Sequence, residues 1–127
     1  MGLVTWFDEK FYPGVKNSWD NTMFREYILQ RVKPEHVMLD LGAGAGSLPQ
    51  MNFRGKAKKV CGVDPEETVT KNPFLDEGKV GFGESIPWPD ATFDLVVSGN
   101  VLEHLENPSD VFKEVSRVLK QIGRAHV

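Results

Sequence analysis

The sequence predicts an α/β fold with a doubly wound parallel sheet. Apolar runs at residues 36–41, 59–63 and 93–98 have the length of buried strands, and central parallel strands are apolar on both faces. Segments with helical spacing lie between and around these runs, and strands that alternate with helices form sheets of this class. A glycine-rich loop directly after the first run adds a candidate ligand site.

The elements are expected in a simple order along the chain. A first helix begins at Ser18 or Asp20 and ends near Val32, before a Lys-Pro pair, and a last helix follows Asn107, which is a suitable cap. Between them the sequence predicts strands at 36–41, 59–63, 79–82 and 93–98 and a helix at 47–54. It also predicts a loop at 65–78, either alone or with a short helical turn, a rigid loop at 86–90 and a short helical segment at 101–105.

The stretch VMLDLGAGAG, residues 37–46, combines the first strand with one acid, Asp40, and with Gly42, Gly44 and Gly46 at alternate positions. Glycine takes positive φ without strain and lets a ligand approach the backbone. A helix after the loop would add free N–H groups and the positive end of its dipole. The stretch therefore indicates a nucleotide-like ligand at the carboxyl end of the first strand.

A second acid, Asp64, ends the second apolar run. A carboxylate at this point of a βαβ unit accepts hydrogen bonds from the two hydroxyls of a ribose. The alternative is a surface acid that opens a turn before Pro65. The glycine loop upstream favours the ribose role.

Three blocks of sequence, in order, make the prediction more specific. They are VMLDLGAGAG, VCGVDP and GESIPWPDATFDLVVSGNVLEHL, and the later VFKEVSRVLK fits the same pattern. With these blocks the chain resembles a class I S-adenosylmethionine-dependent methyltransferase of the methyltransferase-11 type, over about residues 32–120. The resemblance implies a Rossmann-like sheet and S-adenosyl-L-methionine as cofactor.

The resemblance also implies a role for each matching residue. It places Gly42, Gly44 and Gly46 against the methionine end of the cofactor, Asp40 at its amino group and Asp64 at the ribose. It places Gly83, Glu84 and Ser85 along the adenine, Ile86 on the adenine face and Asn100 near the sulfonium.

Phe82 departs from the family pattern. Family members often carry an acid two residues before the position of Glu84, where it bonds the adenine amino group. Either backbone groups and Glu84 recognise adenine here, or the Phe82 ring packs against a ring of the ligand.

Glu103 and His104 are the candidate catalytic residues, because they follow the fourth strand where an acceptor would arrive. Histidine has a suitable pKa for a base, and a base is needed only if the acceptor must lose a proton. The alternative is a structural pair in a short helix. Some quinone-biosynthesis methyltransferases bind a divalent cation here with a further carboxylate, but this chain has Asn100, so no metal is expected.

Composition excludes several classes of protein. The formal net charge of −3 gives no general attraction to nucleic acid, and a single cysteine, Cys61, excludes an internal disulfide. No apolar run has the length of a membrane span, and the start of the chain does not read as a secretory signal. These features predict a cytoplasmic protein. The family resemblance implies a small-molecule methyl acceptor, and the oligomeric state is left open.

Two other functions remain open at this point. A nicotinamide-dependent oxidoreductase would need the spacing GxGxxG, but Ser47 stands where the third glycine is expected. The other is a non-catalytic module that binds the cofactor and lacks an acceptor site.

The chain is expected to divide into three parts. Residues 1–17 are irregular and aromatic, and residues 18–121 form the first part of a methyltransferase domain, with four strands in the order 3-2-1-4. The family sheet has seven strands, so the fourth would be an unpaired edge and this fragment would be inactive. Residues 122–127 read as the translation of ATCGGAAGAGCACACGTC, a widely used sequencing adapter, which predicts a non-native tail.

Overall fold

The computed structural model of the chain describes residues 17–99 and 105–126, and the predictions for residues 1–16, 100–104 and 127 lie outside this part. Its helices are α2 (Asn17–Leu29) and α3 (Pro108–Val118), with short 3-10 helices η1 (Pro49–Met51) and η2 (Glu67–Lys71). Its strands are β1 (Val37–Leu41), β2 (Lys59–Asp64), β3 (Glu77–Val80), β4 (Phe93–Val97) and β5 (Leu119–His126). No helix in the described residues is long and apolar enough to cross a membrane.

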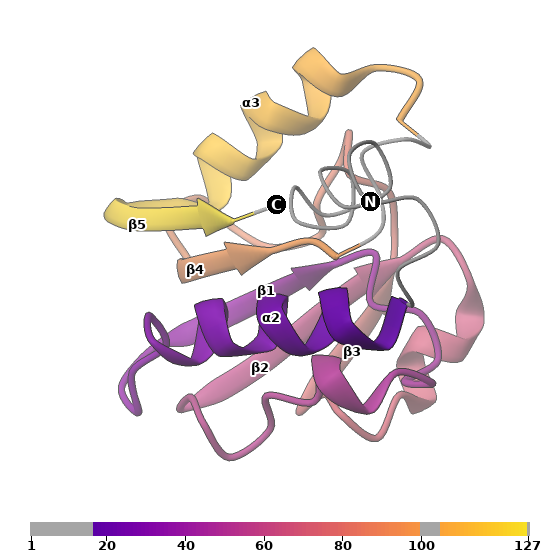
Figure 1. Ribbon diagram of the computed structural model, residues 1–127. Coiled ribbons are helices and arrows are strands. Elements are labelled where there is room, and N and C mark those ends of the chain that lie inside the picture. Colours follow the sequence, from indigo (N-terminus) through magenta and orange to yellow (C-terminus); the bar gives the residue numbers. More distant parts are fainter. Residues whose placement is uncertain (1–16, 100–104, 127) are drawn as a thin grey trace, which may run out of the picture.

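The strands form one parallel sheet in the order β3-β2-β1-β4-β5, which confirms the α/β class and the order 3-2-1-4 (Figure 1). β1 and β2 pair over five positions, from Val37 opposite Lys59 to Leu41 opposite Val63. All four pairings are parallel, so the carboxyl ends of the strands lie along one edge of the sheet. That edge is where a ligand site is expected in such sheets.

The predicted count of four strands is wrong, because β5 pairs with β4. Val96 lies opposite Ala125 and Val97 opposite His126, and β4 is therefore not an unpaired edge. Most residues of β5 are exposed, and buried and exposed positions alternate only weakly along it, so its sequence has no clear strand pattern. Pairing with the buried strand β4 supplies hydrogen-bond partners for the backbone groups of β5. This pairing does not test the origin of residues 122–127, which stays a prediction.

The two helices cover opposite faces of the sheet (Figure 1). α2 packs through Phe24 and Ile28 against a core that includes Met38 of β1, while α3 packs against a core that includes Leu39 of β1. Neighbouring residues of a strand point to opposite faces, so β1 contributes to both cores. This arrangement is the doubly wound sheet that the sequence predicts.

The predicted helix at residues 47–54 is wrong, because only the three-residue η1 forms there. Asn52 leaves the helical region with φ −84° and ψ 102°, and Phe53 is fully buried in the core. The Arg25 guanidinium donates hydrogen bonds to the carbonyls of Gln50 (3.1 Å) and Asn52 (2.6 Å). The two bonds from Arg25 of α2 and the burial of Phe53 stabilise this non-helical conformation in place of the hydrogen bonds of a helix.

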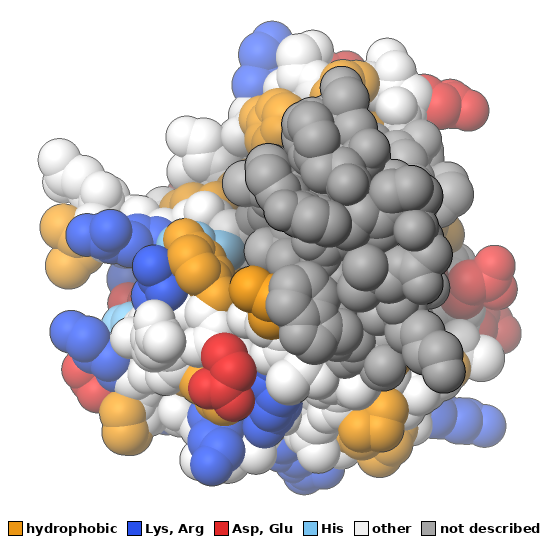
Figure 2. Space-filling model, viewed as in Figure 1, with side chains coloured by type: hydrophobic (Ala, Val, Ile, Leu, Met, Phe, Trp, Pro, Cys, Tyr) orange, Lys and Arg blue, Asp and Glu red, His pale blue; other side chains and the backbone are white. Residues whose placement is uncertain are grey.

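Charged side chains of both signs occur around the outline of the face seen in Figure 2. Arg and Lys lie beside Asp and Glu in several surface pairs, such as Arg54 with Asp76 (3.2 Å) and Lys120 with Asp94 (3.3 Å). Exposed pairs of this kind contribute little to stability.

Candidate functional site

The glycine loop turns sharply at the carboxyl end of β1. Gly42, Gly44 and Gly46 have φ values of 81°, 61° and 81°, a region that favours glycine. The N–H groups of Gly42 and Ala43 both donate to the carbonyl of Val63, at 2.8 and 3.2 Å. The loop is thus fixed to the end of β2.

Asp64, the last residue of β2, holds the same loop through its side chain. One carboxylate oxygen accepts the N–H of Gly44 (3.0 Å) and the other accepts the N–H of Glu66 (2.9 Å). These bonds orient the carboxylate at the edge of the sheet. The structure therefore brings Asp64 and the glycines together, as the sequence predicts.

Two cavities share Gly42 in their linings. The first, of about 190 Å³, is lined by Asp40, by residues 42–48 and by Met51, Asn72, Phe74 and Gly99. The second, of about 310 Å³, is lined by Leu41, Gly42, Val63, Asp64 and Pro65, by residues 81–84 and by Leu105. The first holds Asp40 and the second holds Asp64, so each cavity has one of the two predicted acids.

Asp40 is a buried acid on the wall of the first cavity. Its side chain is 5% exposed, and none of the described residues donates a hydrogen bond to its carboxylate. Burial, with a smaller contribution from the charge of Asp64, raises the pKa of Asp40 from 3.8 to about 7. A cationic ligand group in this cavity would favour the ionised carboxylate.

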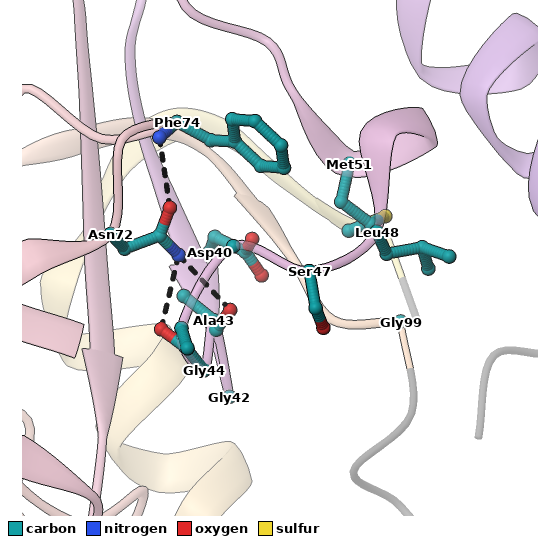
Figure 3. A pocket seen from close by; sticks show the side chains of 12 residues that line it. Asp40, Gly42, Ala43, Gly44, Ser47, Leu48, Met51, Asn72, Phe74 and Gly99 are labelled. Carbon is teal, nitrogen blue, oxygen red and sulfur yellow. Dashed lines mark hydrogen bonds between the residues drawn. The ribbon is translucent and has the colours of Figure 1, made fainter. Parts of the chain in front are cut away.

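Asn72 is the main residue that the sequence prediction missed. Its side-chain nitrogen donates to the carbonyls of Ala43 (3.2 Å) and Gly44 (3.0 Å), and its oxygen accepts the N–H of Phe74 (2.8 Å), as Figure 3 shows. The last bond is an Asx turn, which the pair Asn72-Pro73 signals in the sequence. Leu48, Met51 and Gly99 complete the far side of this cavity and carry no such signal (Figure 3).

The second cavity contains only part of the predicted adenine segment. Gly83 and Glu84 line it, together with Phe82, whose side chain is 59% exposed. Ser85 is exposed and outside this lining, and Ile86 is 3% exposed in the core under α3. Contacts of Ser85 and Ile86 with adenine stay predictions.

A polar cluster on α3 holds the segment after the second cavity. Arg117 donates to the carbonyls of Ile86 (2.9 Å) and Trp88 (3.0 Å), and it pairs with Glu114 and Asp90 (both 2.8 Å). The Glu114 carboxylate accepts the N–H of Ile86 (2.8 Å). These bonds fasten residues 86–90 to α3 and fix the loop that leads from the cavity.

Asn100, Glu103 and His104 lie outside the described residues. Their predicted places near the sulfonium and the acceptor stay predictions. Gly99, the last described residue before them, lines the first cavity.

Comparison with known proteins shows the family to which the chain belongs. Residues 39–127 match the family described as the Methyltransferase domain. The chain is 34% identical over 101 residues to the uncharacterized methyltransferase YcgJ of Bacillus subtilis, covering 72% of this chain and 40% of that protein. It is 32% identical over 111 residues to the ubiquinone/menaquinone biosynthesis C-methyltransferase UbiE of Hydrogenovibrio crunogenus, covering 78% and 44%.

The crystal structure of YcgJ matches the fold with a TM-score of 0.69 at 28% identity, over 80% of this chain and 47% of that one. The chain therefore belongs to the methyltransferase domain family and has the class I methyltransferase fold. It is also 30% identical over 133 residues to a Mycobacterium tuberculosis protein named a probable S-adenosylmethionine-dependent methyltransferase, covering 95% of this chain and 46% of that protein. It spans less than half the length of these curated relatives.

Substitution of Gly46 by alanine tests the packing of the loop. A Cβ at Gly46 would collide with Asn72 and Pro73, whereas a Cβ at Gly55, with a similar φ of 85°, would meet nothing within 4 Å. We expect Gly55→Ala to cost roughly 1–2 kcal/mol of unfolding free energy from its φ. Gly46→Ala should cost a further 1–3 kcal/mol or so from overpacking, measured by urea unfolding. Equal losses in both variants would contradict this packing.

Substitution of Asp40 by asparagine tests its burial. The folded-state pKa of about 7 exceeds the usual 3.8, so the stability that protonation gives is complete below pH 3.8 and lost as the pH rises to about 7. Asp40→Asn removes this loss. Its unfolding free energy relative to the unsubstituted protein should rise by up to about 4 kcal/mol between pH 4 and 8. A difference that stays constant with pH would show that Asp40 ionises normally.

Proposed function

We propose that this chain is the cofactor-binding part of a methyltransferase that transfers a methyl group from S-adenosyl-L-methionine to a small-molecule acceptor. The observation that supports this most directly is the pair of cavities that share Gly42 in their linings, with Asp40 in one and Asp64 in the other. The cofactor also has two halves, an amino acid and an adenosine, joined at the sulfonium. The family match supplies the choice of this ligand.

In this proposal the first cavity receives the methionine end. Asp40 would accept the ammonium group, because its buried carboxylate lines this cavity and a cation beside it would favour the ionised form. The backbone of Gly42, Gly44 and Gly46 would contact the same end of the cofactor. Burial makes the charge interaction with Asp40 stronger than it would be in water.

The second cavity would receive the adenosine. Asp64 lines it and is already oriented by two backbone N–H groups, so it is placed to accept the ribose hydroxyls. Phe82 and Glu84 line the same cavity. We propose that the exposed Phe82 ring packs against adenine, while Gly83 and Glu84 lie along its edge.

The chemistry of transfer places few demands on the protein. S-adenosyl-L-methionine supplies an activated methyl group, so the protein mainly aligns the acceptor with the sulfonium. We propose that Asn100 lies near the sulfonium and that His104, with Glu103, removes a proton where the acceptor requires it. Relatives named as quinone C-methyltransferases make a quinone one candidate acceptor. We further propose that this chain binds the cofactor without transferring its methyl group.

Binding of the cofactor tests the proposal directly. We expect the 127-residue chain to bind S-adenosyl-L-methionine and its demethylated product, S-adenosylhomocysteine, in isothermal titration calorimetry, and to give no binding heat with NAD. All three ligands contain adenosine, so the comparison tests the glycine spacing and the first cavity rather than adenine recognition. Binding of NAD alone would refute the proposed function.

Substitution of Asp64 by alanine tests the adenosine half. Loss of the charge-assisted bonds to the ribose should weaken binding of S-adenosylhomocysteine by about 1–3 kcal/mol. Asp76→Ala is the matched control, since Asp76 also accepts a strand N–H, that of Val60 (2.8 Å), but lines neither of the two cavities. The same affinity in both variants would remove Asp64 from the cofactor site.

A further inference from the structure

The glycine loop of this chain has no α-helix behind it. In a βαβ unit a following helix normally fixes such a loop and directs its N–H groups at the ligand. Here the chain passes from Gly46 through Ser47 and Leu48 to the three-residue η1, which is too short for that role. Another part of the molecule must hold the loop in place.

Asn72 makes that contact from the other side. It follows η2, in the connection between β2 and β3, and its side chain is 7% exposed. One amide nitrogen donates to two successive loop carbonyls, those of Ala43 and Gly44, at 3.2 and 3.0 Å. Both donor hydrogens of the amide therefore have a loop carbonyl as partner.

The amide is itself held in place. Its oxygen accepts the N–H of Phe74 at 2.8 Å, so the two ends of the side chain have different and fixed partners. Gly46 lies directly against the same amide, because a Cβ there would collide with it. The side chain is thus locked between the loop and its own turn.

The loop is then fastened on two sides. Its N–H groups at Gly42, Ala43 and Gly44 bond the end of β2, and its carbonyls at Ala43 and Gly44 bond Asn72. Among the described residues, no hydrogen-bond partner accepts the N–H groups of Ala45, Gly46 and Ser47, which line the first cavity. These are the groups that remain for a ligand.

We propose that Asn72 is a positioning residue, which holds the glycine loop so that the N–H groups of residues 45–47 receive the amino-acid end of the cofactor. This inference rests on the proposed function. It assigns to the Asn72 side chain the positioning of the loop that a following helix would otherwise provide. Asn72 acts through the loop and has no role in binding the adenosine half.

The proposal is tested with two variants and two ligands. Asn72→Asp keeps the acceptor for Phe74 but turns a second oxygen toward the two loop carbonyls. Asn72→Ser keeps a hydroxyl that can close the same turn, and it removes the amide N–H donors to the loop without adding charge. Asn107→Asp is the matched control, because Asn107 is exposed and its side chain makes no capping bond. The ligands are S-adenosylhomocysteine and 5′-methylthioadenosine, which lacks the amino acid.

We expect both Asn72 variants to bind S-adenosylhomocysteine at least about tenfold more weakly, as the loss of one or two hydrogen bonds implies. Their affinity for 5′-methylthioadenosine should stay within about twofold of the unsubstituted protein, as should both affinities of Asn107→Asp. If Asn72→Asp does not fold, Asn72→Ser decides the outcome.

Other outcomes distinguish a failure of the role of Asn72 from a failure of the proposed function. Unchanged affinity for S-adenosylhomocysteine, or an equal loss for both ligands, would overturn the role of Asn72 while leaving the proposed function intact. Failure of the unsubstituted protein to bind either ligand would refute the proposed function and this inference with it.

Discussion

The junction between β1 and β2 is the contact on which the site depends. The parallel register of the two strands continues beyond their ends, because Gly42 and Ala43 donate to Val63 and Gly44 donates to the side chain of Asp64. Each of these bonds requires the sharp turn that glycine allows. Together they place the loop and Asp64 next to each other, and the two cavities form on either side of Gly42.

The charges of the site match a cationic ligand. Asp40 and Asp64 belong to neighbouring strands, and the charge of Asp64 adds to burial in raising the pKa of Asp40. Ionised Asp40 is unfavourable in this buried position, because its charged carboxylate loses solvent. S-adenosyl-L-methionine carries an ammonium and a sulfonium, so its binding would relieve this cost. Asp64 therefore both holds the loop and adds negative charge to the site, whereas Asn72 holds the loop without adding charge.

Sequence patterns predicted the inner strands and missed the segments whose structure depends on distant partners. The apolar runs of β1, β2 and β4 are buried on both faces, so the pattern alone identified them. The helix expected at 47–54 did not form, because Arg25 donates hydrogen bonds to two of its carbonyls and Phe53 is buried in the core. β5 could not be predicted either, since its backbone is ordered by pairing with β4 rather than by its side chains.

The sequence alone determined the class of the fold and the identity of the loop, because buried strands and glycine turns are encoded locally. The order of the first four strands came from the family resemblance of the sequence. The sequence also indicated Asp40 and Asp64, since acids at strand ends need no knowledge of distant contacts. Only the tertiary structure brought Asn72 to the loop, 28 residues from Gly44 along the chain. It alone placed Phe82 and Glu84 on the second cavity and Ile86 in the core. Hydrogen bonds between distant segments depend on how the strands and their connections pack, and no local pattern records that packing.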